Sequence, residues 1–193
     1  MKNNDYFRYD YYYWKKFFTR KDIQKLYKVL KKHENKEFKD SPAYTATNKD
    51  LKNLKNVTAV QWVYLKELLG KLNDTIALTN RQEYGFNIDY PLLDFENVLF
   101  NTYLKDNFYD WHKDGSNHAL HDIKFTVLIN SSLKKYSGGD FQIFTTGGAH
   151  TVPTFNDTGD VIMFKSDTPH RVLPVQQGER NSITLFIKGS KFV

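Results

Sequence analysis

A histidine and an aspartate two residues apart are the first chemically suggestive feature of this sequence. They lie in the segment Tyr109-Asp110-Trp111-His112-Lys113-Asp114-Gly115. If the segment is extended, alternate side chains point to the same side, so His112 and Asp114 project together and Lys113 points away. An imidazole and a carboxylate are two of the ligands in the two-histidine, one-carboxylate site that holds non-haem Fe(II) with open positions. The tripeptide alone is weak evidence for a metal site, and the polar end of an ordinary strand is the simpler interpretation.

A third metal ligand would have to be another histidine, and the chain has six. His170 is the best candidate because it begins an apolar strand pattern directly after the pattern that ends in Val161-Ile162-Met163-Phe164. His33 lies in a charged helical stretch, where a solvated surface residue is the simpler interpretation. The other three follow turn or loop residues and are expected at the surface, with substrate contact left open for the first two: His118, His121 and His150.

A strand pattern after His170 has one polar side headed by an arginine. Arg180, Ser182 and Thr184 share this side and alternate with isoleucine and leucine. Such a face fits a polar pocket, because the guanidinium fork can hold a carboxylate through two hydrogen bonds and a nearby hydroxyl adds a donor. The alternative is a structural ion pair between Arg180 and a carboxylate of the same chain.

The second half of the chain predicts a series of short strands. After Phe95, apolar and β-branched runs alternate with turn residues, which suggests a jelly-roll sandwich or barrel. Gly147-Gly148 predicts a hairpin turn, since the residues of a phosphate-binding loop do not follow. The predicted strands are Asn97–Leu104, Tyr109–His112, Ile123–Asn130, Asp140–Thr145, His150–Pro153, Asp160–Phe164, His170–Val175 and Ser182–Lys188.

The first half predicts two supporting helices. Thr19, with an acid three residues later, is typical of a helix start, and the apolar spacing carries this helix to about His33. A longer amphipathic helix is predicted from about Thr58 to Leu78. The polar stretch Glu34–Val57 predicts a long loop, and it is a lid candidate together with Ser132–Gly138.

These patterns predict a mainly β fold with N-terminal helices, in which a jelly-roll core is braced by two α-helices. We expect a single domain over residues 1–193, with a helical support region at 1–94 and the jelly-roll core at 95–193. The aromatic segment Asp5–Trp14 is expected to form an early strand or an extended piece against the sheet. A stacking platform for bases is the alternative for this segment.

Composition excludes several kinds of site. The chain has no cysteine, so disulfides, thiolate zinc sites and cysteine nucleophiles are excluded. Hydrophobic residues make up 40% of the chain, which fits a globular protein. Because there is neither an apolar signal core at the amino terminus nor an apolar run that could cross a bilayer, we expect a cytoplasmic protein without a membrane partner.

The chain is basic, with a formal net charge of +6 and a pI near 9.2. Much of the excess lies early in the sequence, and we interpret it as the solvated lysine-rich face of a helix. Attraction to an acidic partner or to nucleic acid stays open. No zinc knuckle, recognition helix or aromatic RNA-binding signature accompanies the lysines.

Together and in this order, His112-x-Asp114, His170 and Arg180-x-Ser182 resemble the iron(II)/2-oxoglutarate-dependent dioxygenases, specifically their prolyl 4-hydroxylase-like branch. The resemblance covers about Asn80 to Lys188 and is strongest from Phe100 on. Asn80–Phe86 is similar to the segment that precedes the core in small bacterial and phage members. Further matching pieces are Tyr103, Tyr109, Gly138-Gly139-Asp140-Phe141, His170-Arg171-Val172, Pro174-Val175 and Gly178.

The resemblance implies a double-stranded β-helix (jelly-roll) core with two sets of functional residues. It implies three Fe(II) ligands, namely His112, Asp114 and His170. It also implies a 2-oxoglutarate site formed by Arg180, Ser182 and Tyr103. O2 would be the further substrate, and ascorbate is an additional candidate cofactor. Leu128 stands where a tyrosine often helps to bind the cosubstrate in animal oxygen-sensing relatives, so the donors around the distal carboxylate are expected to differ.

The implied activity is hydroxylation of an unactivated C–H bond with release of succinate and CO2. The expected target is a prolyl residue of a peptide or protein. A free amino acid, another side chain or a nucleic-acid base stays open, because metal and cosubstrate residues say little about the prime substrate. A non-catalytic jelly-roll binding module is the alternative from a different class. Four aromatic residues are expected either to shield the site or to form plain core: Trp111, Phe125, Phe141 and Phe164.

Overall fold

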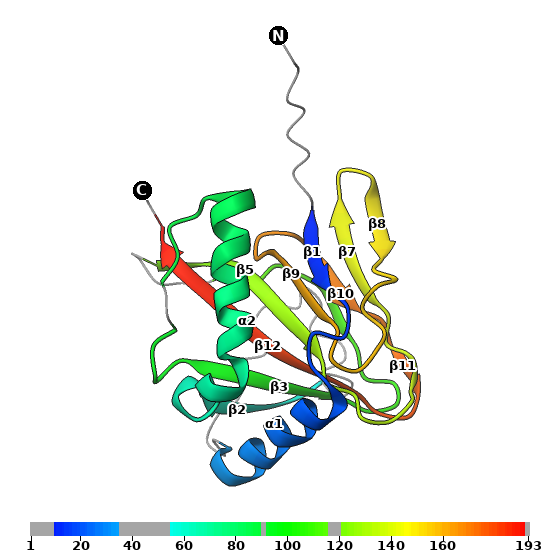
Figure 1. Ribbon diagram of the computed structural model, residues 1–193. Coiled ribbons are helices and arrows are strands. Elements are labelled where there is room, and N and C mark those ends of the chain that lie inside the picture. Colours follow the sequence, from blue (N-terminus) through cyan, green and yellow to red (C-terminus); the bar gives the residue numbers. More distant parts are fainter. Residues whose placement is uncertain (1–9, 35–54, 90–91, 116–120, 192–193) are drawn as a thin grey trace.

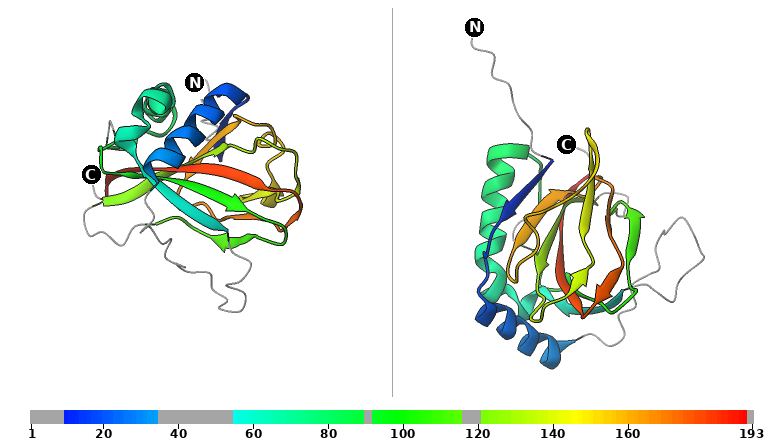
Figure 2. Two further views of the ribbon diagram at one scale, coloured as in Figure 1. Left: turned by 90° about the horizontal axis from the view of Figure 1, so that it is seen from below. Right: turned by 90° about the vertical axis from the view of Figure 1, so that its right-hand side faces the viewer.

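Two antiparallel sheets form the centre of the computed structural model, which describes residues 10–34, 55–89, 92–115 and 121–191. Helices α1 and α2 cover one face of the larger sheet, and the smaller sheet packs on its other face (Figures 1 and 2). The predicted architecture, a jelly-roll core braced by two α-helices, is confirmed. In the described part of the chain, no helix is long and apolar enough to span a bilayer.

The larger sheet has six strands in the order β1-β9-β5-β12-β3-β2, and the smaller has four in the order β4-β10-β7-β8. The larger sheet contains Tyr11–Trp14 (β1), Val161–Lys165 (β9), His121–Asn130 (β5), Arg180–Ser190 (β12), Asn97–Tyr103 (β3) and Asn56–Gln61 (β2). The smaller contains Tyr109–His112 (β4), His170–Val172 (β10), Phe141–Thr145 (β7) and Gly148–Thr151 (β8). The remaining elements are the strand pair Ser137–Gly138 (β6) and Val175–Gln177 (β11), the helices Arg20–His33 (α1) and Lys66–Thr79 (α2), and the helical turns Trp62–Tyr64 (η2) and Asn80–Tyr84 (η3).

Alternation along the central strands produces two separate cores. On β12, Ile183, Leu185 and Ile187 face the helices and join a core with α1 and α2. The intervening residues face the smaller sheet, where a second core contains Phe141 and Phe164. Burial of each large apolar side chain contributes about 1.5 to 3 kcal/mol, so the two cores hold the sheets in a fixed relation. The space between the sheets is where the polar side of β12 lies.

The predicted second helix begins too early. Residues 56–61 form β2 and pair with β3, and α2 starts only at Lys66. The β-branched residues Val57, Thr58 and Val60 favour a strand, in which Ala59 and Val60 are completely buried. The apolar residues at helical spacing begin at Trp62, and the predicted helix was extended from there to about Thr58. Residues 56–61 form a strand instead, because pairing with β3 stabilises it.

The other predicted elements are mostly confirmed within a few residues. The pattern His170–Val175 is divided into β10 and β11, because Pro174 between them has no amide hydrogen for the ladder. The predicted early strand is β1, which pairs with β9, although residues 5–9 lie outside the described part of the chain. Residues 35–54 of the predicted loop Glu34–Val57 lie outside it as well.

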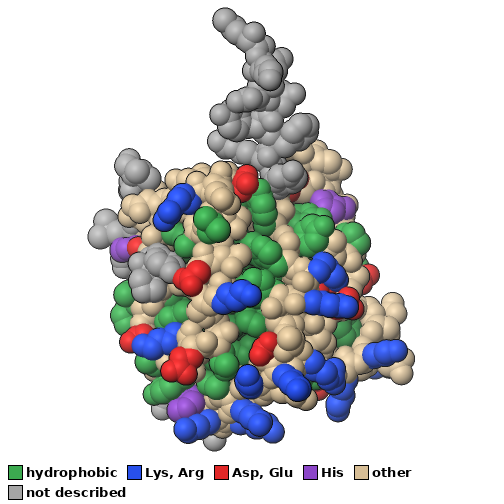
Figure 3. All heavy atoms as spheres, in the orientation of Figure 1, with side chains coloured by type: hydrophobic (Ala, Val, Ile, Leu, Met, Phe, Trp, Pro, Cys, Tyr) green, Lys and Arg blue, Asp and Glu red, His purple; other side chains and the backbone are tan. Residues whose placement is uncertain are grey.

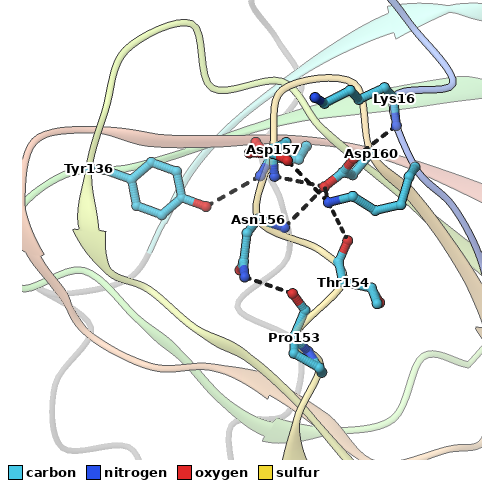
Figure 4. A network of polar contacts seen from close by, with 9 residues as sticks. Lys16, Tyr136, Pro153, Thr154, Asn156, Asp157 and Asp160 are labelled. Carbon is cyan, nitrogen blue, oxygen red and sulfur yellow. Dashed lines mark hydrogen bonds and ion pairs between the residues drawn. The ribbon is translucent and has the colours of Figure 1, made fainter.

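A buried carboxylate fastens β1 to the loop before β9 (Figure 4). Asp160 is 1% exposed, and its Oδ2 accepts from Lys15 Nζ at 2.6 Å and from the amide of Asp157 at 2.7 Å. Its Oδ1 accepts from the amide of Lys16 at 2.9 Å. The same loop carries Phe155, whose ring lies 5.9 Å from the guanidinium of Arg180. This network therefore holds one wall of the space between the sheets.

We expect Asp160→Ala to lower the free energy of unfolding by about 2 to 3 kcal/mol, because it removes the buried carboxylate that accepts from Lys15 and from the amides of Lys16 and Asp157. Denaturant unfolding measures this loss. Asp157→Ala is the matched control: its side chain is 57% exposed and meets only Lys15, at 3.2 Å, so the expected loss is below about 1 kcal/mol. Equal losses in the two variants would contradict the role assigned to Asp160.

Candidate active site

Three side chains that the sequence singled out lie together at the mouth of the space between the sheets. His112 ends β4, His170 begins β10, and the two residues are register partners. One ligand atom from each, with one carboxylate oxygen of Asp114, all lie within 4.8 Å of one another. The Nε2 atoms of His112 and His170 lie 3.7 Å and 3.4 Å from the Asp114 carboxylate. All three side chains are at most 14% exposed.

Backbone carbonyls fix the orientation of both imidazoles. His112 Nδ1 lies 2.7 Å from the carbonyl oxygen of Asp110, and His170 Nδ1 lies 3.0 Å from that of Thr168. In the neutral ring, an Nδ1–H that donates to each carbonyl leaves a lone pair on Nε2. Both Nε2 atoms face Asp114, which is the arrangement that a metal-ligating histidine needs.

The carboxylate of Asp114 is also fixed. Thr126, on the inner side of β5, donates from its hydroxyl to Asp114 Oδ2 at 2.5 Å. The amide of Asp114 donates to the carbonyl of Ser166 at 2.9 Å, which anchors the backbone just beyond β4. Sequence reasoning missed Thr126, although a hydroxyl inside the apolar run of β5 was a signal. Lys113 is exposed, as the alternation predicted.

Arg180 lies deeper between the sheets and is 2% exposed. Its Nη1 donates to Ser182 Oγ at 3.4 Å, and its guanidinium carbon lies 5.0 Å from the ring centre of Tyr103 on β3. Arg180 forms no ion pair with any residue that the structure describes, so the alternative of a structural Arg–carboxylate pair fails within that part of the chain. A buried guanidinium without a carboxylate partner among the described residues is suited to binding an anion.

Residues 98–188 contain every side chain of these two clusters, and they match the sequence profile of the 2OG-Fe(II) oxygenase superfamily. Just under half of the chain is thus similar to this superfamily. Fe(II) and 2-oxoglutarate are its cofactors, and the donor set of the two clusters is of the kind that they need.

Individual proteins are similar to this chain in sequence or in fold. A PKHD-type hydroxylase of Nitrosomonas europaea is 32% identical over 99 residues, which are 47% of this chain and 42% of the relative. The viral collagen prolyl hydroxylase of Paramecium bursaria Chlorella virus-1, solved as a 2OG complex, shares the fold with a TM-score of 0.66 and 16% identity, covering 94% of this chain and 97% of that one. A prolyl hydroxylase from Trichoplax adhaerens, solved with a hypoxia inducible factor peptide, has a TM-score of 0.62 and 15% identity, covering 92% and 83%. The chain spans about half the length of the curated relatives it matches.

A polar strip continues from Arg180 along the inner side of the larger sheet. Asn101 Nδ2 donates to Thr184 Oγ1 at 2.9 Å, and Asn101 Oδ1 has no hydrogen-bond partner among the described residues. Both side chains are at most 6% exposed. Leu128 is the register partner of Thr184, so the neighbouring position on β5 offers no donor. Sequence reasoning missed Asn101, because β3 reads as an ordinary apolar strand and only its pairing with β12 brings this amide to the strip.

The Gly138-Gly139 pair permits the close approach of Arg180. Gly139 has a φ of +66°, and a Cβ there would lie 2.8 Å from Arg180 Cδ and 3.0 Å from Val175 Cγ2. Gly138, with a φ of +69°, would place a Cβ 2.6 Å from the carbonyl oxygen of Pro174. Glycine is therefore required at both positions, by backbone conformation and by space.

Two of the four expected aromatic walls border the cluster. The rings of Phe141 and Phe164 lie 5.8 Å and 4.7 Å from the ring of His170. Phe125 belongs instead to the core under the helices. Trp111 lies on the opposite side of β4 from His112, with the guanidinium of Arg171 over its ring at 4.6 Å.

The remaining described histidines lie elsewhere. His33 stacks on Tyr64 with ring centres 3.9 Å apart, and His150 has its ring centre 6.1 Å from that of Tyr11. His121 lies 3.8 Å from the carboxylate of Asp89. His118 falls outside the described residues.

Burial makes both histidines of the cluster poor bases. It lowers the pKa of His170 to about 4. Burial also lowers the pKa of His112 to about 3, with a further decrease from repulsion by His170 that attraction to Asp114 only partly offsets. Both imidazoles are therefore neutral near pH 7, so a metal ion does not have to displace a proton from them.

These shifts predict that the metal-free protein loses stability in weak acid. Between pH 6.5 and 4 the unfolded chain binds protons on these histidines while the folded chain does not, so the free energy of unfolding falls as the pH falls. The loss at pH 5 is about 2 kcal/mol for each histidine. Denaturant unfolding in the presence of a chelator at several pH values measures it. His170→Gln should remove about half of this loss, and an unchanged pH dependence in that variant would contradict the assignment.

We expect Gly139→Ala to destabilise the protein by about 2 to 4 kcal/mol, because the added methyl group meets Arg180 and the φ is unfavourable for alanine. Thermal unfolding measures the loss. Gly70→Ala is the matched control, since a Cβ there meets nothing within 4 Å and alanine favours the helix. A tolerated Gly139→Ala would show that Arg180 does not need this space.

Proposed function

We propose that this oxygenase hydroxylates a prolyl residue of a peptide or protein and converts 2-oxoglutarate and O2 to succinate and CO2. One observation carries the proposal: the cluster of His112, Asp114 and His170 shares the space between the sheets with a buried arginine that has no carboxylate partner among the described residues. The cluster suits a metal ion, and the buried arginine suits a dianionic cosubstrate.

The donor set fits Fe(II). Two neutral imidazoles and one carboxylate are the ligand types of the non-haem iron site, and three protein ligands leave positions for other molecules. We assign His112, Asp114 and His170 as these ligands. When bound, Fe(II) supplies the activation of O2 and the oxidative decarboxylation of 2-oxoglutarate.

The remaining residues position and shield the reactants. The carbonyls of Asp110 and Thr168 hold the two imidazoles, and the hydroxyl of Thr126 holds the carboxylate, so the ligand atoms are arranged before metal arrives. The aromatic rings of Phe141 and Phe164 keep water away from His170.

We assign the cosubstrate site to Arg180, with Ser182 and Tyr103 beside it. A guanidinium can hold the distal carboxylate through two parallel hydrogen bonds. The hydroxyl of Ser182 already accepts from Arg180 and keeps its own hydrogen to donate. The ring of Tyr103 lies against the guanidinium and limits its freedom.

Proteins of similar fold and one aromatic side chain of this protein support a prolyl target. The Trichoplax adhaerens and Chlorella virus proteins, which share the fold, are prolyl hydroxylases. Within the chain, the ring of Tyr109 lies 3.9 Å from the ring of His112 and offers an apolar face to a pyrrolidine ring beside the metal ligands. Lys55 lies over the same ring at 4.2 Å, so this face of the site also carries a positive charge.

Incubation with Fe(II), 2-oxoglutarate and a panel of proline-containing peptides tests the proposal. We expect succinate release coupled to a peptide heavier by one oxygen atom, located on proline by fragmentation in the mass spectrometer. Matched peptides with alanine in place of proline should not be modified. Succinate release with product formed only on free amino acids, other side chains or nucleic-acid bases would overturn the prolyl assignment while leaving the oxygenase chemistry in place.

We expect Arg180→Lys to weaken 2-oxoglutarate binding about 10- to 100-fold, because lysine keeps the charge and loses the two-pronged fork. Calorimetry with Mn(II) in place of Fe(II) measures this without turnover, and Mn(II) affinity itself should not change. Arg171→Lys is the matched control, since Arg171 lies against Trp111 on the other side of its sheet. Equal effects of the two substitutions would contradict the site.

A further inference from the structure

A stripe of lysines runs along the exposed face of α1. The residues are spaced by three or four positions, which places their side chains in one row along the helix: Lys21, Lys25, Lys28 and Lys32. All four are exposed, and so are Arg20 and Lys31 beside them. The apolar residues Ile23 and Leu26 lie on the opposite face and are completely buried. The row is thus held in place by a helix whose other face is fixed to the sheet.

Almost nothing in the described structure neutralises this stripe. The acid inside α1 is Asp22, which caps the helix at Thr19 and lies 3.8 Å from Lys25. The other three lysines of the stripe form no ion pair with a described residue. Like charges three or four positions apart disfavour a helix, so the row opposes the stability of the element that carries it.

Three lysines elsewhere in the described chain are paired with carboxylates. Lys15 meets Asp160 at 2.6 Å, Lys66 meets Asp94 at 3.4 Å, and Lys188 meets Glu96 at 2.6 Å. In the α1 stripe, by contrast, Lys25 alone lies near a described carboxylate, that of Asp22.

The positive surface continues beyond the helix. The guanidinium of Arg20 donates to the carbonyl of Leu133 at 2.5 Å and joins α1 to a loop in which Lys134 and Lys135 are exposed. A hollow of about 460 Å³ lies here, lined by these three basic side chains and by hydroxyl and amide groups. Its acidic lining residues are Asp140 and Asp157, of which Asp157 is paired with Lys15. Figure 3 shows Lys and Arg side chains gathered along the lower part of this face, where Figure 1 places α1.

An exposed aromatic ring lies at the end of α1. Tyr64 stacks on His33, the last residue of the helix, with ring centres 3.9 Å apart and planes at 11°. The tyrosine is 46% exposed, so part of its ring stays open to solvent. A supported, partly open ring beside a row of cations is the combination that binds single-stranded nucleic acids, because phosphates follow the cations and bases stack on rings.

We propose that this basic surface, formed by Arg20, the α1 lysine stripe, Lys134 and Lys135, binds single-stranded nucleic acid, with Tyr64 as a stacking site. An acidic peptide would use the charges and leave the ring without a role. None of these residues is a metal ligand or cosubstrate residue assigned above, and the proposal does not depend on the prime substrate.

Fluorescence anisotropy with a labelled oligothymidylate of about 20 nucleotides tests the proposal at several salt concentrations. We expect the logarithm of the affinity to fall with the logarithm of the salt concentration, by about 0.7 for each phosphate neutralised. The variant Lys21→Gln/Lys25→Gln/Lys28→Gln/Lys32→Gln should bind at least about tenfold more weakly and should reduce this slope by about 3. Tyr64→Ala should weaken binding about fivefold or more, whereas Tyr64→Phe should retain it.

The matched control changes the same charge elsewhere, at the exposed residues Lys71, Arg81, Lys105 and Lys191, each replaced by glutamine. It should bind as the unmodified chain does. An equal loss in both quadruple variants would show that net charge alone is responsible, and equal binding of polyglutamate would favour an acidic protein; either result overturns the proposal. Circular dichroism checks the fold, and Lys25→Gln/Lys28→Gln replaces the quadruple variant if that one unfolds.

Discussion

The structure depends on how charge is accommodated between the two sheets. Asp114 and Arg180 are both buried there, one beside the histidines and the other deeper on β12, and no ion pair joins them. Bound Fe(II) carries two positive charges and 2-oxoglutarate two negative charges, so the loaded interior would be neutral overall. Each charge would then lie next to an opposite one, which is the condition for burying ions at acceptable cost. The cluster around Asp114 and the guanidinium of Arg180 would then be complementary halves of one ligand-binding interior.

The two sheets contribute different residues to this interior. The smaller sheet supplies both histidines, through adjacent strands whose register places His112 opposite His170. The larger sheet supplies Thr126, Arg180 and Ser182, together with the core that fixes its distance from the smaller sheet. Helices α1 and α2 cover the outer face of the larger sheet and leave its inner face free for chemistry. The position of the arginine relative to the histidines is therefore set by sheet packing, and neither sheet alone would determine it.

Residue type and alternation were enough to predict much of this. His112 and Asp114 could be selected by their alternate spacing, His170 by its place at the start of a strand pattern, and Arg180 because it heads a polar strand side. Thr126 and Asn101 could not, since their roles come from contacts with residues far away in sequence, Asp114 across the sheets and Thr184 across a strand pair. The start of α2 was placed too early for the same reason: β2 is a strand because β3 pairs with it.

The central claim is that one ligand reaches from the histidine cluster to Arg180. Calorimetric titration with 2-oxoglutarate and with glutarate, which lacks the oxo group, tests it most directly when each is measured with and without Mn(II). Both dicarboxylates can use Arg180, whereas the 2-oxo acid end of 2-oxoglutarate can also use the metal. We expect Mn(II) to tighten 2-oxoglutarate binding at least about tenfold and to leave glutarate binding unchanged. An equal affinity for 2-oxoglutarate with and without Mn(II) would contradict the account.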